Sequence, residues 1–461
     1  MPIAAALKGA RCGFLVVPEN RSVDNGRTIR LAVAIVPAGS STPAPDPVVD
    51  LTGGPGSPTI SGAQQLVTAG FNRDRELILM DQRGTGYSQP ALTCPEIDRF
   101  SSRSVGVRLD SPVTRRLRVA AVAACYRRLA AQGIDLGAYN TAENAADFAD
   151  LRKALGIAQW NVYGASYGTD LALTLMREHP KGIRTVTLDS VVPPSVVSLS
   201  GIWPNVRDAF ANLFRACAAQ LPCRVRHPGL QATITRLVRR LEAHPLAAKV
   251  SPGKGKPAVT VALDGGALAQ WMVVMSATPF WPEVPALIQA LAAGRPGRVL
   301  ALRREIFAPP PGELGYGLQY GVACSEWVPY EAPGEVLAVG RRAFPTYPAS
   351  VVAHPAGGFN SLPDDCRVWG VPKAPPAQRQ VTTSTIPTLI IHGTFDAITS
   401  LRWAQITVQT LPSSTLASFP GAGHVVVSAS PCAQRVFASF LSSPTAPDTL
   451  CVGRLRPPAL R

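Results

Sequence analysis

One short segment has the pattern of a serine nucleophile. Residues 160–169 read Trp-Asn-Val-Tyr-Gly-Ala-Ser-Tyr-Gly-Thr, which places Ser166 at the centre of a Gly-x-Ser-x-Gly motif between a strand-like run and a helix-like run. A strand-to-helix turn of this kind is so sharp that large side chains at the flanking positions would clash, and it leaves the serine hydroxyl exposed at the helix N-terminus. The motif therefore predicts that Ser166 is a nucleophile for acyl transfer.

A serine nucleophile needs a base, and the chain has six histidines. Four of them precede proline, which restricts their backbone to extended or turn geometry: His179, His227, His244 and His354. His424 lies in a glycine-rich loop after a strand-like run and is the predicted base, whereas His392, at the end of an apolar strand, is interpreted as structural. Asp396 follows that strand and is the predicted acid, with Asp189 as the alternative.

Attack on a carbonyl group creates an oxyanion, which two backbone N–H groups must stabilise. Tyr167, the residue after the nucleophile, is expected to supply one of them. The other is expected from the glycine-rich loop at residues 52–56, Thr-Gly-Gly-Pro-Gly, which follows an early apolar run. A phosphate-binding loop would need a following Lys-Ser or Lys-Thr pair, which this loop lacks, so a nucleotide site is not favoured.

Short apolar runs alternate with helical patterns in the first half of the chain, which predicts an α/β fold with a mainly parallel sheet and helices on both faces. Residues 193–380 are helix-like and broken by Pro/Gly loops, and strand patterns then return. We therefore expect one core, residues 1–192 and 381–461, that carries a large, mostly helical inserted cap at 193–380. The predicted strands are Leu31–Val36, Val48–Leu51, Leu77–Met80, Trp160–Tyr163, Thr185–Leu188, Thr388–Ile391 and Thr415–Phe419.

The composition excludes several classes of protein. With 46% hydrophobic and 16% charged residues among 461, the chain is neither disordered nor a small disulfide scaffold. Its net charge of +15 comes from scattered arginines without a nucleic-acid-binding motif, so nucleic acid is not an expected partner. No run of 18 apolar residues exists, so no membrane span is predicted.

The nine cysteines indicate an oxidising compartment. They include no Cys-x-x-Cys pair and no Cys/His cluster with zinc-ligand spacing, so disulfides are expected and no metal or other cofactor is predicted. The N-terminal residues have no apolar region of signal-peptide length. We expect a secreted or periplasmic protein whose export signal is not in this sequence, with the cytoplasm as the alternative.

Four motifs together resemble the prolyl iminopeptidase group of α/β hydrolases: Gly53–Gly56, Asp81–Ser88, Gly164–Gly168 and the loops of Asp396 and His424. The C-terminal region, with Cys432 and Cys451, resembles the secreted tripeptidyl aminopeptidase branch. The resemblance implies that Ser166, Asp396 and His424 form a triad and that Gly54 and Tyr167 are the oxyanion donors.

The resemblance also implies a substrate-binding segment and a disulfide pattern. Within Cys324-Ser-Glu-Trp, Glu326 is the candidate carboxylate for a substrate ammonium group, and Trp327 is its neighbour in substrate binding. Together with spacing, the resemblance suggests four bridges that leave Cys12 free: Cys94–Cys125, Cys217–Cys223, Cys324–Cys366 and Cys432–Cys451.

These features predict a cofactor-free serine exopeptidase that cleaves peptide bonds near a free N-terminus through an acyl-enzyme. Whether it would release one residue, as a prolyl or alanyl aminopeptidase, or a tripeptide stays open. A carboxylesterase with the same triad is the nearest alternative, and a catalytically inactive hydrolase fold that serves as a binding module is a third. The expected partner is a peptide or a small ester or amide, and a monomer is favoured.

Overall fold

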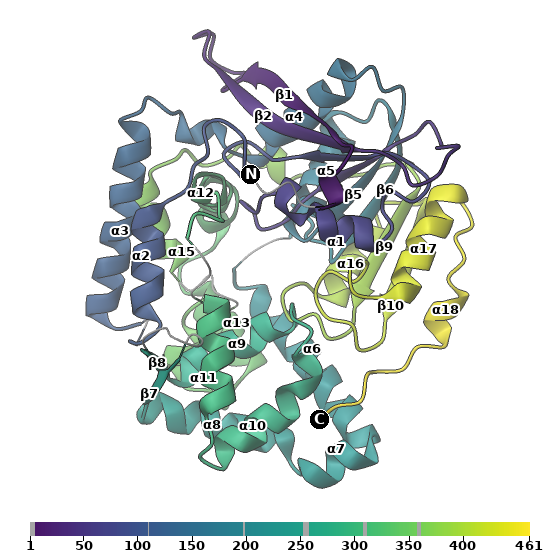
Figure 1. The fold of residues 1–461 in the computed structure, drawn as a ribbon. Helices are drawn as coiled ribbons and strands as arrows, with labels where there is room; N and C mark the ends of the chain where they lie inside the picture. The colour runs from purple at the N-terminus through teal and green to yellow at the C-terminus, as the bar shows by residue number, and fades with distance from the viewer. Residues whose placement is uncertain (1–4, 109, 197–198, 252–257, 308–310, 357–360) are drawn as a thin grey trace.

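The computed structural model of the protein describes residues 5–108, 110–196, 199–251, 258–307, 311–356 and 361–461 (Figure 1). Within them, one sheet of eight strands has the order β1-β2-β4-β3-β5-β6-β9-β10. β2 pairs antiparallel with β1 and β4, and the remaining neighbours are parallel. The strands are β1 (Arg11–Pro18), β2 (Thr28–Val36), β3 (Val48–Leu51), β4 (Leu77–Met80), β5 (Trp160–Ala165), β6 (Ile183–Asp189), β9 (Thr388–Gly393) and β10 (Ser414–Phe419).

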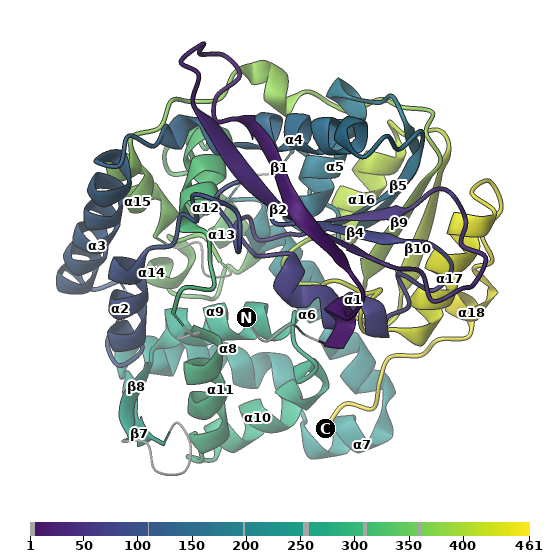
Figure 2. The same ribbon diagram turned by 45° about the horizontal axis from the view of Figure 1, so that its top comes forward.

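Helices cover both faces of this sheet. Successive side chains along its strands point alternately into two buried apolar clusters, one on each face. Val49 and Val162 lie in the cluster that also contains Leu171 of α5, whereas Val48 and Tyr163 lie in the cluster that contains Phe437 of α17. The first face carries α4 (Thr141–Ala154), α5 (Tyr167–Glu178) and α16 (Leu401–Val408), and the second carries α1 (Ala63–Thr68) and α17 (Pro431–Ser442), with α18 (Leu450–Gly453) beside β10 (Figure 2). The α/β fold class predicted from the sequence is confirmed.

Between β6 and β9 the chain forms a helical region, which we call the cap. Most of its helices bury an apolar cluster of their own, whereas Tyr316–Val322 and Leu362–Trp369 contribute to the cluster on the first face of the sheet. Its helices are α6 (Ile202–Ala219), α7 (Leu221–Arg226), α8 (Leu230–Ala243), α9 (Gly265–Met275), α10 (Val284–Ala292), α11 (Gly297–Phe307), α12 (Tyr316–Val322), α13 (Glu335–Ala343), α14 (Ala349–Val352) and α15 (Leu362–Trp369). A two-stranded antiparallel ribbon, β7 (Leu246–Val250) and β8 (Val259–Leu263), lies among them. It was not among the predicted strands.

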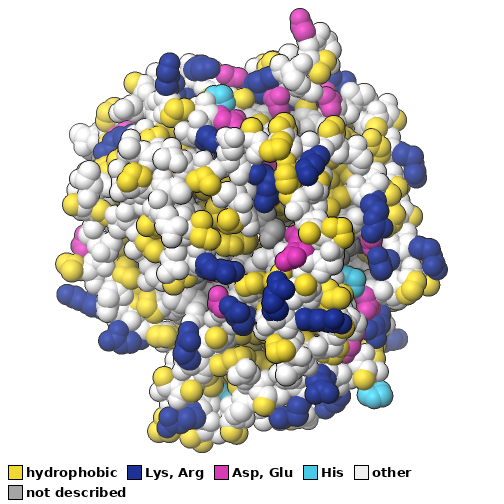
Figure 3. All heavy atoms as spheres, turned by 180° about the vertical axis from the view of Figure 1, so that it is seen from behind, with side chains coloured by type: hydrophobic (Ala, Val, Ile, Leu, Met, Phe, Trp, Pro, Cys, Tyr) yellow, Lys and Arg dark blue, Asp and Glu magenta, His cyan; other side chains and the backbone are white. Residues whose placement is uncertain are grey.

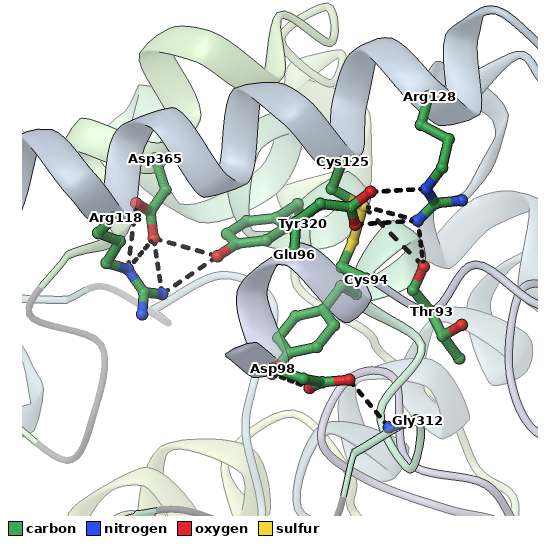
Figure 4. Close-up of a disulfide and its surroundings, with 11 residues drawn as sticks. Thr93, Cys94, Glu96, Asp98, Arg118, Cys125, Arg128, Gly312, Tyr320 and Asp365 are labelled. Carbon is green, nitrogen blue, oxygen red and sulfur yellow. Dashed lines mark hydrogen bonds and ion pairs between the residues drawn. A yellow bond between two sulfur atoms is a disulfide. The ribbon is translucent and has the colours of Figure 1, made fainter. Parts of the chain in front are cut away.

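Two helices that precede β5 lie beside the cap rather than over the sheet (Figures 1 and 2). They are α2 (Pro95–Ser104) and α3 (Pro112–Ala130). Arg118 of α3 forms an ion pair with Asp365 of α15 at 2.8 Å, and Tyr320 Oη donates to the same carboxylate at 3.1 Å (Figure 4). The cap therefore packs against a helical pair from the first half of the chain.

The four disulfides implied by the resemblance are confirmed. Cys94–Cys125 joins α2 to α3 (Figure 4), and Cys324–Cys366 joins the segment that carries Glu326 to α15. The other two are Cys217–Cys223 and Cys432–Cys451, and Cys12 is a free, exposed thiol on β1. Several disulfides in one chain are typical of extracellular or periplasmic proteins.

The basic side chains on one face of the molecule are interspersed with acidic ones (Figure 3). On the face shown in Figure 3, Lys and Arg side chains are spread among Asp and Glu side chains. Several arginines are held internally: Arg83 is buried and pairs with Asp147 at 2.8 Å. No helix in the described part of the chain is long and apolar enough to cross a membrane.

Candidate active site

Ser166 occupies the turn between β5 and α5. It is the N-cap residue of α5, with φ 55° and ψ −125°, a backbone conformation that L-residues rarely adopt. Its N–H donates to Asp189 O at 3.0 Å, and Thr169 N–H donates to its carbonyl at 2.8 Å. A strained residue fixed by its neighbours in this way is characteristic of a nucleophile turn.

The glycines around Ser166 are required by close packing of backbone on backbone. A Cβ at Gly168 would meet the carbonyl oxygen of Leu51, and a Cβ at Gly164 would meet the carbonyl oxygen of Gly168. A Cβ at Gly53 would lie 2.6 Å from Ala165 O and 2.9 Å from Ser166 Cβ. The glycines on either side of Ser166 meet the steric requirement predicted from the sequence, and the glycine-rich loop packs directly against the serine turn.

Asp396 and His424 form a hydrogen-bonded pair. His424 Nδ1 lies 2.8 Å from Asp396 Oδ2, and both side chains are nearly or completely buried. Asp396 also accepts the N–H groups of Ile398 and Thr399 at 2.8 and 2.9 Å and the Thr399 hydroxyl at 2.5 Å. The acid is thus held in place by its own loop.

This pair has shifted proton affinities. Burial by itself raises the pKa of Asp396, but His424 and the hydrogen bonds outweigh it and hold that pKa well below its usual range. Burial is the largest single effect on His424 and lowers its pKa, but the charge and hydrogen bond of Asp396 and the charge of Asp189 together outweigh burial and raise that pKa above its ordinary value. With Asp396 ionised, the neutral imidazole keeps its proton on Nδ1, and the lone pair of Nε2 is free to accept a proton from another group.

Asp189, the alternative acid, has another position and other partners. Its carboxylate accepts the N–H of Val426 at 2.9 Å and of Val427 at 2.8 Å, and the hydroxyl of Tyr163 at 2.8 Å. Val425, next to the histidine, has φ 62°, and its N–H donates to Ser190 Oγ at 2.9 Å. Asp189 therefore fixes the backbone of the histidine loop.

His392 lies on β9 and is nearly completely buried. Burial lowers its pKa to about 4, so this imidazole is neutral near pH 7. This environment is consistent with the structural role predicted for it.

A cavity of about 40 Å³ brings several of the predicted residues together. Gly54, Ser166, Tyr167 and Trp327 line it. Thr399, which donates to Asp396, belongs to the same wall. Among the described residues, no hydrogen bond joins Ser166 Oγ to His424. Hydrogen bonds between a nucleophile and its base are often long without substrate and shorten only in the substrate complex. The remaining lining residues are Val192, Leu199, Ile202, Ile398 and Trp403, which make the wall mainly apolar.

Glu326 lies outside the lining of that cavity, as far as the described residues define it. It is buried, and Thr141 donates to both of its oxygens, through N–H at 2.8 Å and through the hydroxyl at 2.7 Å. The Thr141 hydroxyl is also 3.1 Å from Tyr167 Oη. Burial raises the pKa of Glu326 to about 7. Glu326 is therefore connected to the cavity wall through Thr141 and Tyr167.

The motif Asp81–Ser88 supports the glycine-rich loop. Asp81 accepts the N–H groups of Thr59 and Ile60 at 2.7 and 2.9 Å, just after that loop, and the N–H of Tyr87 at 2.8 Å. Gln82 donates its amide to Thr52 O at 2.7 Å. The sequence reveals this motif but not its function, which is to hold the loop against the serine turn.

Several lining residues escaped prediction because each is an ordinary core residue in sequence. Trp403 of α16 and Ile202 of α6 carry no motif, and only the fold brings them to Ser166. Thr399 had a weak signal, since Asp396 and Thr399 form an Asp-x-x-Thr pattern in which the carboxylate accepts the later N–H.

A family model described as the alpha/beta hydrolase fold matches residues 46–430. The chain therefore belongs to the α/β-hydrolase fold family. A tripeptidyl aminopeptidase of Streptomyces coelicolor is 29% identical over 199 residues, covering 41% of this chain and 36% of that protein. A proline iminopeptidase of Xylella fastidiosa is 26% identical over 204 residues, covering 44% and 50%. These relatives confirm the resemblance, and the matches span half or less of the relatives' own length.

Two solved structures match most of the chain at low sequence identity. The proline iminopeptidase of Mycobacterium smegmatis is 17% identical with a TM-score of 0.40, covering 94% of this chain and 99% of that chain. A thermophilic esterase from Thermogutta terrifontis is 16% identical with a TM-score of 0.39, covering 94% and 100%. A fold does not by itself determine a substrate, which has to be inferred from the residues of the site.

Proposed function

We propose that this protein is a serine hydrolase that cleaves peptide bonds near a free N-terminus, with Ser166 as nucleophile, His424 as base and Asp396 as acid. The observation that carries the proposal is the combination of a strained serine at the N-terminus of α5 with a buried Asp396–His424 pair at 2.8 Å. A shared site is supported by Thr399, which lines the same cavity as Ser166 and donates a hydrogen bond to Asp396.

The mechanism follows from these positions. His424 Nε2 takes the proton of Ser166 as Oγ attacks the carbonyl carbon, and Asp396 stabilises the imidazolium through Nδ1–H. The oxyanion accepts hydrogen bonds from the N–H groups of Tyr167 and Gly54. When the tetrahedral intermediate collapses, His424 returns the proton to the leaving amine, and water releases the acyl group by the same steps in reverse.

Substrate selection depends on the cavity wall and on the carboxylate behind it. The wall next to Ser166 is formed by apolar residues such as Val192 and Ile202, which suits an apolar side chain of the substrate. Glu326 is proposed to favour a substrate ammonium group by its charge, and Trp327 to contact the substrate. Because Thr141 already donates to both Glu326 oxygens, we propose an electrostatic effect exerted through the wall rather than an unobstructed contact.

A carboxylesterase is the second candidate, and one observation favours it. No charged side chain is among the described residues that line the cavity, and an ester substrate needs none. Four disulfides support the proposal that either enzyme would work in an extracellular or periplasmic compartment.

The experiment compares aminoacyl and tripeptidyl arylamides with their N-acetylated forms and with matched esters. The expected result is hydrolysis of the free-amine arylamides and a lower kcat/KM after acetylation. Ser166→Ala should abolish turnover and labelling by a fluorophosphonate. Equal rates with free and acetylated substrates would favour the esterase, and an unlabelled wild-type protein would favour the inactive binding module.

A further inference from the structure

Ser276, at the C-terminal end of cap helix α9, contacts both the acid loop and the histidine loop. Its carbonyl oxygen accepts the N–H of His424 at 2.9 Å, and its hydroxyl accepts the N–H of Ala397 at 3.2 Å. The same hydroxyl donates to Val273 O at 2.7 Å, so its orientation is fixed by α9. Ser276 is 1% exposed, so water does not compete for these bonds.

The contact is close on the histidine side as well. A Cβ at Gly423, the residue before His424, would meet the carbonyl oxygen of Ser276. Only glycine therefore allows the histidine loop to lie so near the end of α9.

The acid loop is attached to the cap on both sides of Asp396. Phe395 and Ala397 are buried in the apolar core of the cap, and the ring of Phe395 lies 6.2 Å from that of Trp281. From α6, Asn212 donates to Thr394 O at 2.6 Å, and Asn205 donates to Ile398 O at 2.9 Å. The loop that carries the acid is therefore packed largely by the cap, although β9, which precedes it, belongs to the sheet.

We infer that Ser276 is a positioning residue that fixes Asp396 and His424 relative to each other, so that the cap aligns the catalytic pair as well as enclosing the substrate. Its role in turnover rests on the proposed function, whereas its effect on the geometry of the pair does not. One serine holds the residue after the acid through its side chain and the base itself through its backbone. A displacement of the end of α9 would therefore move both loops.

The competing explanation is that Ser276 only terminates α9. Its N–H donates to Val273 O, as expected of a residue at a helix C-terminus. A residue with that role alone would affect stability without affecting the imidazole of His424. The titration of His424 separates the two explanations, because Asp396 accepts its hydrogen bond and Asp189 and His392 are the other ionisable groups that act on it.

The experiment measures the His424 imidazole in the full-length protein by NMR titration, with His424→Gln to assign its resonance. The test variant is Ser276→Ala, which removes the acceptor for Ala397 N–H and leaves the backbone acceptor for His424 N–H. The matched control is Asp264→Ala, which removes the N-cap side chain of the same helix, at the end remote from the loops. Arylamide or ester hydrolysis and the thermal midpoint are measured on the same samples.

The inference predicts that Ser276→Ala lowers the pKa of His424, because a looser Asp396 stabilises the imidazolium less while burial continues to disfavour it. It also predicts about a 10-fold fall in kcat with KM changed less than about two-fold. Asp264→Ala should lower the thermal midpoint and leave the pKa of His424 unchanged. An unchanged pKa in Ser276→Ala, or an equal change in both variants, would overturn the inference. If wild-type protein hydrolyses nothing, the proposed function fails while the titration still decides the role of Ser276.

Discussion

Asp396 Oδ2 and His424 Nδ1 lie 2.8 Å apart in a buried environment, although 28 residues separate them in the chain. The charge and hydrogen bond of Asp396, with the charge of Asp189, raise the proton affinity of His424 and together outweigh the opposing effect of burial. In the proposed mechanism His424 accepts a proton only when it is neutral, so this relationship would set the pH range of activity.

The first prediction concerns that pH dependence. Because the pKa of His424 lies above the ordinary value of about 6.5, kcat/KM should fall as pH decreases, with a midpoint above that value. A pH–rate profile with an arylamide or ester checks it. His392→Gln is the control and should retain the midpoint, because the pKa of His392 is about 4. A wild-type midpoint near 4 would contradict the assignment of His424.

Substitution of each candidate acid should show which of Asp396 and Asp189 takes part in catalysis. Asp396→Asn should lower kcat by on the order of 10⁴-fold, because an amide donor favours the wrong imidazole tautomer. Asp189→Asn should mainly lower the free energy of unfolding, by about 2 kcal/mol, since an amide cannot accept as many of the donors that Asp189 binds. Urea unfolding and steady-state kinetics on both variants decide the matter. If Asp189→Asn showed the larger loss of kcat in a stable protein, the acid would have to be reassigned.

Gly53→Ala tests the packing of the glycine-rich loop on the nucleophile. The new Cβ would lie 2.9 Å from Ser166 Cβ and 2.6 Å from Ala165 O, so the serine turn or the loop must move. We expect kcat to fall by about 100-fold, the effect of a displacement of roughly 1 Å at a reacting group. Gly62→Ala is the matched control, because a Cβ there meets nothing within 4 Å. Fluorophosphonate labelling rates should follow the same order, and similar rates for both variants would argue against this role for Gly53.

Disulfide contributions to stability should follow loop length. Cys324–Cys366 closes a separation of 42 residues and Cys217–Cys223 one of six. On the chain-entropy model, removing the first should cost roughly 4 kcal/mol and the second roughly 2 kcal/mol. Urea unfolding of the two double Cys→Ala variants checks this order. Cys12→Ser should leave the free energy of unfolding unchanged. It should also remove the one thiol that reacts with a thiol reagent in the denatured, unreduced protein. A reversed order would show that native-state strain dominates.

Elements and site residues could be predicted from the sequence where the chemistry requires a local pattern of residues. The serine turn, the glycine-rich loop and most strands of the sheet follow from steric requirements and apolar runs, and the structure has β3 and β4 at the predicted residues. β1 was missed because it is an edge strand whose first four residues are exposed, so its apolar signal is weak. Ser276 could not be predicted, because it lies 120 residues before Asp396 and acts through a carbonyl oxygen that every residue has. The partners of Glu326 were equally hidden, since Thr141 reaches it only in the folded chain.

The last prediction tests whether Glu326 recognises an ammonium group. Its pKa is about 7, and a bound ammonium would favour the ionised form, so preference for a free amine should weaken as pH falls through 7. The measurement is the ratio of kcat/KM for an arylamide to that for its N-acetylated form, in which the titration of His424 cancels. Glu326→Gln should lower this ratio and remove its pH dependence, whereas Asp98→Asn, at a carboxylate on α2, should leave it unchanged. If Glu326→Gln instead slows both substrates equally, Glu326 acts only through Thr141 and Tyr167, as a support for the cavity wall.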